Sequence, residues 1–369
     1  MPSLLDRLDA PGPKRLLALD GGGIRGVVTL GFLVRIEQLL RERADNPSYV
    51  LSDYFDLIGG TSTGAIIAAA LAQGVSAAEM QEKYLTLGAK VFGKRRFMRV
   101  SSLFDAAPLE AELKGMFGVQ TLGDRSLRTG LCVVAKRADT ESTWPLMNHP
   151  RSTFYDKNKD MPIWSVVRAS AAAPGYFIPQ LVNVGGGETG MFIDGGVSMA
   201  CNPALQLFMV ATLKGFPFRW PLGEDKLFMV SVGTGSWKQR TSPQAMAAYK
   251  LWDWASAVPR MLMNDSSQLN ETVLQCLSSS PTARRIDSEV GTLADDLWSA
   301  NPILTYVRYD VALEESTVRD LGVPMGKVPV AETRRLDRAE HRHLLRRIGD
   351  AAAARTVHAS HFPAAFDPA

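Results

Sequence analysis

A serine stands between two glycines at residues 60–64, within the stretch GGTSTGAII. Gly60-Thr61-Ser62-Thr63-Gly64 has the G-x-S-x-G spacing of a nucleophile elbow, a tight strand-to-helix turn that exposes the serine hydroxyl. The apolar run YFDLIGG precedes Ser62 and AIIAAALAQG follows it, so the order of elements is the required one. An ordinary strand-to-helix turn has a similar composition, and the motif alone is weak. Because a serine hydroxyl needs a base to accept its proton, the next question is which residue that is.

A second glycine-rich segment, DGGGIRG at 20–26, follows the apolar run KRLLALD. One interpretation is a dinucleotide site with G-x-G-x-x-G spacing, which requires an acidic residue at the end of the next strand about 20 positions later. Glu42 and Asp45 are near that distance but precede the second strand. The other interpretation is an oxyanion hole, since Gly21, Gly22 and Gly23 present successive N–H groups at a helix N-terminus. We favour the oxyanion hole because it needs no cofactor beside a nucleophilic serine.

The base is sought among the histidines and the acids. The five histidines are His149, His341, His343, His358 and His361. Four of them lie in a basic C-terminal segment, and none follows a strand as part of a glycine turn. Asp194 does, because MFIDGGV ends an apolar strand in an acid followed by Gly195 and Gly196. Alone, this motif is more simply a turn cap, but a desolvating pocket would raise the pKa of the carboxyl and make it a better base.

The elements that must position these residues follow a strand–turn–helix pattern. Short apolar runs predict strands near 14–20, 54–60, 129–137 and 227–233, and helical periodicity follows the first two glycine turns. Residues 181–196 predict a glycine-turned hairpin whose second strand delivers Asp194. The fold class is therefore α/β, with a mostly parallel sheet covered by helices. We expect the strand ends that carry the glycines, Ser62 and Asp194 to converge on one crevice.

The C-terminal third carries weaker signals. Helices are predicted near 243–263 and 266–277, and 331–355 is predicted as one basic amphipathic helix packed on or beside the domain. The tail at 356–369 is predicted to be frayed. No internal repeat or low-complexity linker occurs, so 14–330 is expected to form one catalytic domain.

Composition limits the function classes. The chain has 369 residues and a formal charge of +3, too small to indicate nucleic-acid binding. Three separated cysteines indicate neither a disulfide framework nor a zinc site. The N-terminus lacks a signal-peptide core and no apolar run is long enough to span a bilayer, so we expect a cytoplasmic protein. Basic and apolar residues alternate in FGKRRFMRV at 92–100, which suggests a mobile cap in peripheral contact with membrane, although a solvated charge run explains it equally well.

Together the three motifs resemble the patatin-like phospholipases. That family combines a D-G-G-G-x-R/K-G loop, a G-x-S-x-G serine and a later D-G-G/A aspartate, and all three occur here in the same order, at 20–26, 60–64 and 194–196. The segments RASAAAPGYFIP and SVGTG also resemble the family, and the likeness covers about residues 14–236.

The resemblance implies a three-layer α/β/α sandwich and a Ser–Asp dyad. Ser62 would be the nucleophile and Asp194 the base, the N–H groups of Gly21, Gly22 and Gly23 would form the oxyanion hole, and Arg25 would support that loop. It implies hydrolysis of phospholipid or other acyl-ester substrates through an acyl-enzyme, with no metal or cofactor. Whether a ligand activates the enzyme stays open.

Two other functions are carried forward. The first is an α/β-hydrolase esterase in which His341 or His343 completes a Ser–Asp–His triad. Against it, Ser62 arrives after only two strands and the triple glycine is left without a role. The second is a non-catalytic module that binds a nucleotide through GGGIRG.

Overall fold

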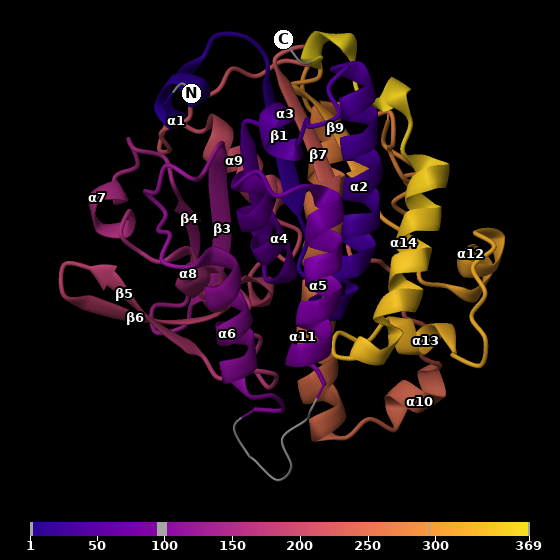
Figure 1. Ribbon diagram of the computed structural model, residues 1–369. Coiled ribbons are helices and arrows are strands. Elements are labelled where there is room, and N and C mark those ends of the chain that lie inside the picture. Colours follow the sequence, from indigo (N-terminus) through magenta and orange to yellow (C-terminus); the bar gives the residue numbers. More distant parts are fainter. Residues whose placement is uncertain (1–2, 94–101, 295, 368–369) are drawn as a thin grey trace.

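A nine-stranded mixed sheet forms the centre of the molecule (Figure 1). The computed structural model describes residues 3–93, 102–294 and 296–367. The strand order is β5-β6-β3-β2-β1-β7-β9-β8, with β4 paired to β3. The strands are β1 (Lys14–Leu19), β2 (Leu57–Thr61), β3 (Gly130–Arg137), β4 (Ser142–Met147), β5 (Gln180–Gly185), β6 (Glu188–Asp194), β7 (Leu227–Val232), β8 (Ser278–Ser279) and β9 (Leu304–Tyr309). The six strands from β3 to β8 in this order run parallel, which confirms the predicted mostly parallel sheet.

Helices cover both faces of the sheet. The α-helices are α1 (Leu4–Asp9), α2 (Gly26–Arg43), α3 (Leu51–Tyr54), α4 (Thr63–Ala72), α5 (Ala77–Val91), α6 (Ala106–Phe117), α7 (Tyr155–Asn158), α8 (Ile163–Ser170), α9 (Ala204–Thr212), α10 (Pro243–Ala247), α11 (Leu251–Leu277), α12 (Glu315–Asp320), α13 (Val330–Thr333) and α14 (Arg342–Thr356). Short 3₁₀ turns are η1 (Gly23–Arg25), η2 (Gly195–Val197), η3 (Ala339–His341), η4 (Ala359–His361) and η5 (Ala364–Phe366).

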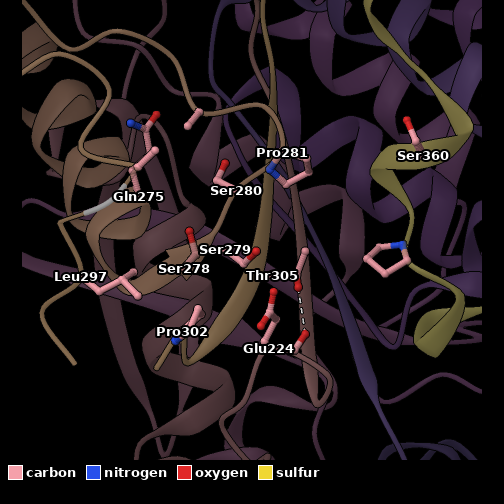
Figure 2. Close-up of a pocket in the computed structure, with 13 residues that line it drawn as sticks. Glu224, Gln275, Ser278, Ser279, Ser280, Pro281, Leu297, Pro302, Thr305 and Ser360 are labelled. Atoms are coloured by element: carbon pink, nitrogen blue, oxygen red, sulfur yellow. Dashed lines mark hydrogen bonds between the residues drawn. The ribbon is translucent and has the colours of Figure 1, made fainter. Parts of the chain in front are cut away.

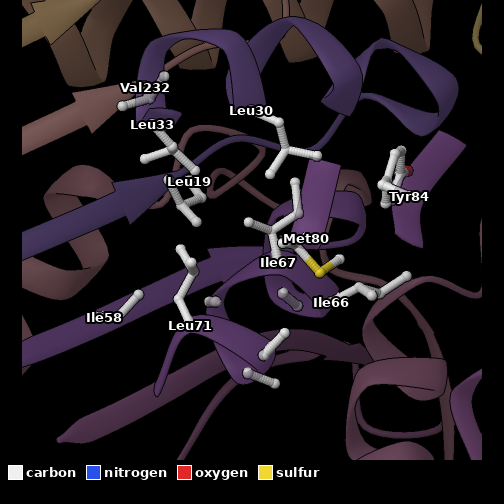
Figure 3. Packing of buried hydrophobic residues seen from close by; sticks show 14 of the residues in the cluster. Leu19, Leu30, Leu33, Ile58, Ile66, Ile67, Leu71, Met80, Tyr84 and Val232 are labelled. Atoms are coloured by element: carbon white, nitrogen blue, oxygen red, sulfur yellow. The ribbon is translucent and has the colours of Figure 1, made fainter. Parts of the chain in front are cut away.

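The alternation of side chains along β1 explains the three layers. Leu17 and Leu19 enter the core shared with α2, α4, α5 and α14, part of which is shown in Figure 3. Leu16 and Ala18 point to the opposite face and enter the core shared with α9 and the end of α11. Successive residues of a strand face opposite sides of the sheet, so the apolar residues 16–19 of β1 supply both cores. The α/β/α sandwich predicted from sequence is confirmed.

Small residues allow α4 to pack directly behind the serine turn. Every residue of α4 is buried. A Cβ on Gly60 would lie 2.2 Å from the carbonyl carbon of Gly64, and a Cβ on Gly64 would lie 2.1 Å from the carbonyl oxygen of Leu19. Larger side chains at either position would push the helix away from the ends of β1 and β2.

The C-terminal segment differs from the sequence prediction. The expected helix at 331–355 is divided into α13, η3 and α14, because the chain between them turns inward and the Leu336 carbonyl accepts a hydrogen bond from the Ile24 N–H at 2.9 Å. α14 packs against α2, where a Cβ on Gly31 would lie 2.6 Å from the carbonyl carbon of Gly349. The expected frayed tail is also wrong for the residues described, since Phe362 and Phe366 are buried against Phe228.

Two further expectations concern helices and membrane contact. α10 and α11 replace the predicted pair at 243–263 and 266–277, with a continuous α11 running through Pro259. Of the stretch at 92–100, residues 94–100 lie outside the described residues. Among the helices that the structure describes, none combines the length and apolar character that crossing a bilayer demands.

Candidate active site

The ends of β2 and β6 meet along one edge of β3. β4 pairs with β3 from Cys132 to Arg137 and so occupies its other edge. β2 pairs with β3 up to Val134, and β6 continues along the same edge from Ala135 in the antiparallel direction. Ser62 directly follows β2 and Asp194 ends β6, so the two residues meet head to head. The expected convergence therefore occurs, but β6 is antiparallel and not one of a set of parallel strand ends.

Ser62 occupies a strained turn between β2 and α4. Its φ of 56° and ψ of −122° are unusual for a residue with a side chain, and the surrounding packing must hold this conformation. Its backbone N–H donates to Ser170 Oγ at 2.8 Å, and that hydroxyl donates to the Val134 carbonyl at 2.6 Å. Ser170 thus ties the turn to β3.

The Ser62 hydroxyl donates to Asp194 Oδ2 at 2.6 Å. The other carboxylate oxygen, Oδ1, accepts the Gly196 N–H at 2.7 Å. Asp194 is only 6% exposed, and burial raises its pKa from 3.8 to about 6, against the opposing effect of the two hydrogen bonds. The pair therefore joins a hydroxyl to a carboxylate that binds a proton more readily than an ordinary aspartate.

The glycine loop at 20–23 lies against Ser62. A Cβ on Gly21 would lie 3.4 Å from Ser62 Cβ, so the backbone of the loop borders the serine. The Gly21 N–H already donates to the Cys201 carbonyl at 2.9 Å, which contradicts its expected availability as an oxyanion donor. Within the described part of the chain, the N–H groups of Gly22 and Gly23 have no hydrogen-bond acceptor. Two of the three N–H groups expected as oxyanion donors therefore lack an acceptor within the described residues, and the third does not.

The loop has little room for side chains. A Cβ on Gly22 would lie 2.2 Å from Thr234 Oγ1, and the hydroxyl of Thr234 donates to the Gly21 carbonyl at 3.1 Å. Gly23 has a φ of 55°, in the left-handed region that favours glycine. Its carbonyl accepts hydrogen bonds from Thr63 Oγ1 and the Tyr84 hydroxyl, both at 2.8 Å. These contacts point the Gly23 carbonyl toward Thr63 and Tyr84 and so fix the direction of the loop.

Arg25 anchors the end of this loop to the segment after β7. Its buried guanidinium donates to the Gly235 carbonyl at 2.7 Å and lies 5.0 Å from the centre of the Trp237 ring. The predicted elbow and acid-turn residues also lie at the site. Thr61 Oγ1 donates to the Ala200 carbonyl at 2.6 Å, and a Cβ on Gly195 would lie 2.2 Å from the Val134 carbonyl oxygen.

Sequence reasoning missed the residue that holds the start of the glycine loop. Arg308 on β9 binds both carboxylate oxygens of Asp20, at 2.9 and 2.6 Å, and also donates to Ser231 Oγ at 2.7 Å. The only signal in the sequence is an arginine inside the otherwise apolar run ILTYVRY. Ser170 was also missed, although it belongs to the small-residue segment already noticed.

Other titratable groups near the dyad have different states. A Cβ on Gly196 would lie 3.6 Å from the Cys201 sulfur, but burial raises the pKa of that thiol to about 12, so it stays protonated. Among the described residues, no histidine is hydrogen bonded to Ser62 or Asp194. His149 lies two residues after the end of β4 and is buried, and burial lowers its pKa to about 4.

A separate cavity of about 390 Å³ lies beside β8 and β9 (Figure 2). It is lined by Glu224, Gln275, Ser278, Thr305 and Ser360 among others, and by neither residue of the dyad. Within residues 3–93, 102–294 and 296–367, no three histidine, cysteine, aspartate or glutamate side chains gather as a metal site requires.

Comparison with known protein families shows to which family the chain belongs. The family model described as "Patatin-like phospholipase" matches residues 17–208, slightly more than half of the chain. The chain belongs to the patatin-like phospholipase family. As a member it is a lipid acyl hydrolase that cleaves carboxylic esters, and the resemblance found in its motifs is confirmed.

The relatives of this phospholipase come from plants and bacteria. A probable inactive patatin-3-Kuras 1 of Solanum tuberosum is 27% identical, over 83% of this chain and 87% of that protein. A cGAMP-activated phospholipase of Escherichia coli is 24% identical, over 70% of this chain and 74% of that protein. The crystal structure of VipD from Legionella pneumophila covers 94% of this chain and 67% of its own, with 13% identity and a TM-score of 0.39.

Proposed function

We propose that this phospholipase releases fatty acid from phospholipids and lysophospholipids with Ser62 as nucleophile and Asp194 as general base. The observation that carries the proposal is the 2.6 Å hydrogen bond between Ser62 Oγ and Asp194 Oδ2. The carboxyl has its pKa raised to about 6 by burial, so it is ionised at neutral pH and still basic enough to accept the serine proton.

The first half-reaction transfers the acyl group to the enzyme. Asp194 Oδ2 accepts the proton of Ser62 as Oγ attacks the ester carbonyl carbon. The N–H groups of Gly22 and Gly23 receive the oxygen that becomes negative, aided by the positive N-terminal end of α4. The tetrahedral intermediate then collapses, Asp194 gives its proton to the glycerol oxygen, and the leaving group departs: a lysophospholipid when the substrate is a phospholipid, or a glycerophosphodiester when it is a lysophospholipid.

The second half-reaction regenerates the enzyme. Asp194 accepts a proton from water, the resulting hydroxide attacks the acyl-Ser62 ester, and fatty acid leaves as the serine is reprotonated. Gly60, Thr61, Thr63 and Gly64 hold the elbow, Gly195 and Gly196 hold the acid turn, and Arg25 supports the oxyanion loop. In this scheme no histidine takes part.

The test is product analysis by mass spectrometry after incubation with mixed phospholipids. We expect the wild-type chain to release free fatty acid, and Ser62→Ala to release none above background. The acyl position and headgroup of the consumed lipids then define the type of phospholipase.

Two histidine variants, compared with Asp194→Asn, separate the dyad from a triad. His341→Ala and His343→Ala should leave fatty-acid release intact, whereas Asp194→Asn should lower it about 10²–10⁴-fold. Loss of activity in either histidine variant with retained folding would contradict the dyad and support the esterase alternative.

A further inference from the structure

The first half of α11 exposes an apolar face. Leu251, Trp252, Trp254, Val258 and Leu262, the α11 apolar face, are all exposed, with Trp252 at 82% and Leu251 at 78%. Leu251, Val258 and Leu262 recur at helical spacing of seven and four residues, so they form one stripe. Figure 1 shows the beginning of α11, with α10 nearby, at the lower end of the molecule. A row of large apolar side chains in water has an energetic cost and marks an interaction surface.

This face continues to the catalytic dyad. Further along α11, Met263 is close to the acid turn, since a Cβ on Gly196 would lie 3.8 Å from its methyl carbon. Ser266 and Asn270 of α11 donate hydrogen bonds to the Met199 carbonyl at 2.8 and 2.7 Å. The side chains of Val197 and Met199, three and five residues after Asp194, are themselves exposed. Apolar side chains thus extend from the first half of α11 to the turn that holds Asp194.

The charges around the face favour an anionic surface. Residues 238–265 contain four basic side chains, Lys238, Arg240, Lys250 and Arg260, and two acids, Asp253 and Asp265. Asp253 accepts the Lys250 backbone N–H at 2.8 Å and caps α11. A second copy of the same face would bring like charges together, whereas anionic lipid headgroups would neutralise them. Exposed tryptophans among basic residues are typical of segments that lie at a membrane–water interface.

We propose that the α11 apolar face docks the enzyme on anionic phospholipid bilayers and brings the dyad to the lipid surface. This rests on the proposed function, because it supplies the route by which an insoluble substrate reaches Ser62. Trp252, Trp254 and Leu262 enter the interfacial region, while Lys250 and Arg260 contact headgroups.

Vesicle sedimentation tests the docking without catalysis. Ser62→Ala protein is mixed with vesicles of phosphatidylcholine and phosphatidylglycerol, and with vesicles of phosphatidylcholine alone. We expect binding to the anionic vesicles, and at least a 10-fold weaker partition when Trp252→Ser and Leu262→Ser are added. The matched control is Trp298→Ser with Leu222→Ser, two exposed residues of the same types outside α11, which should bind like the parent.

Hydrolysis of a soluble ester separates docking from chemistry. With Ser62 present, Trp252→Ser/Leu262→Ser should hydrolyse p-nitrophenyl butyrate at a rate within 2-fold of wild type. Its rate of phospholipid hydrolysis on anionic vesicles should be at least 10-fold lower than that of wild type. Unchanged vesicle binding by this variant would overturn the proposal. Light scattering that shows the wild type to be a dimer and the variant a monomer, with vesicle binding intact, would also overturn it, because the face would then be a dimer interface. Wild-type protein that binds vesicles but cleaves neither substrate would instead overturn the proposed function alone.

Discussion

Arg308 on β9 forms a buried, two-point ion pair with Asp20, the residue that directly follows β1 and begins the glycine loop. The two bonds measure 2.9 and 2.6 Å and join residues 288 positions apart. Burial lowers the pKa of Arg308, but the Asp20 carboxylate outweighs this and holds the pKa of the guanidinium well above its usual value, so Arg308 is charged. The start of the loop beside Ser62 is therefore fixed from a strand near the other end of the chain.

Removing Arg308 should destabilise the protein and the site together. Arg308→Met leaves Asp20 buried without its cation, which typically costs about 3–5 kcal/mol in free energy of unfolding. Urea unfolding followed by circular dichroism measures the loss. Because the cost comes from the unpaired carboxylate, Arg308→Met/Asp20→Asn should be more stable than Arg308→Met. A double variant no more stable than the single one would contradict this explanation.

The pKa of Asp194 should determine how activity responds to acid. The base must be ionised to accept the serine proton, and its pKa is raised to about 6 by burial. We therefore expect kcat/KM on a soluble ester to be constant above about pH 7 and to fall toward tenfold per pH unit well below 6. Rates measured from pH 4.5 to 8.5, with circular dichroism at each pH to verify folding, give the profile. A profile flat down to pH 5 would contradict Asp194 as the base.

Asp194→Asn should lower the activity and raise the free energy of unfolding. The carboxyl has a pKa of 3.8 when unperturbed and about 6 when folded. Above pH 6 the carboxyl is charged in both the folded and the unfolded protein, and the folded state bears the full cost of burying the charge. This cost decreases as the pH falls and is absent below pH 3.8, where the carboxyl is protonated in both states. A neutral asparagine avoids this cost, so unfolding at pH 7.5 should require up to about 3 kcal/mol more, at 1.36 kcal/mol per pKa unit.

The measurement is urea unfolding of wild type and Asp194→Asn at pH 7.5 and pH 4. The stability gain should be present at pH 7.5 and nearly absent at pH 4, while ester hydrolysis falls about 10²–10⁴-fold. An equal gain at both pH values would show that packing, and not the buried charge, is responsible.

The sequence predicted the parts of the site that depend on close backbone approach. Residues 60 and 64 have room only for glycine, so the G-x-S-x-G motif indicated the close contact of β2 with α4. The direction of β6 was missed, because side-chain alternation is the same in parallel and antiparallel strands. The available N–H groups were miscounted, because Gly21 bonds to Cys201, a partner that local pattern does not indicate.

The missed contacts in the C-terminal half have a common cause. Arg308 reaches Asp20 only because β7 lies between β1 and β9, and strand order is a property of the whole fold. Leu336 interrupts the predicted helix because its carbonyl binds the Ile24 N–H, more than 300 residues earlier. Periodicity describes each segment by itself, so such long-range pairings lie beyond it.

Gly22 should be essential for activity although it carries no side chain. A Cβ at this position would lie 2.2 Å from Thr234 Oγ1 and 2.5 Å from Thr234 Cβ, too close for either residue to remain in place. The methyl group of Gly22→Ala would push the loop, and with it the N–H groups of residues 22 and 23, away from Ser62. Loss of an oxyanion donor costs about 10²–10³-fold in kcat, so a fall of at least 10²-fold is expected.

The matched control is Gly215→Ala, where a Cβ meets nothing within 4 Å and the φ angle is not positive. Both variants are assayed on p-nitrophenyl butyrate, and thermal unfolding shows what fraction of each is folded at the assay temperature. Gly215→Ala should keep wild-type kcat. If folded Gly22→Ala also kept the wild-type kcat, Gly22 would not help to hold the oxyanion. A loss in kcat with KM nearly unchanged would show that the substitution acts on the transition state, because the displaced N–H groups bind the oxygen only once it becomes negative.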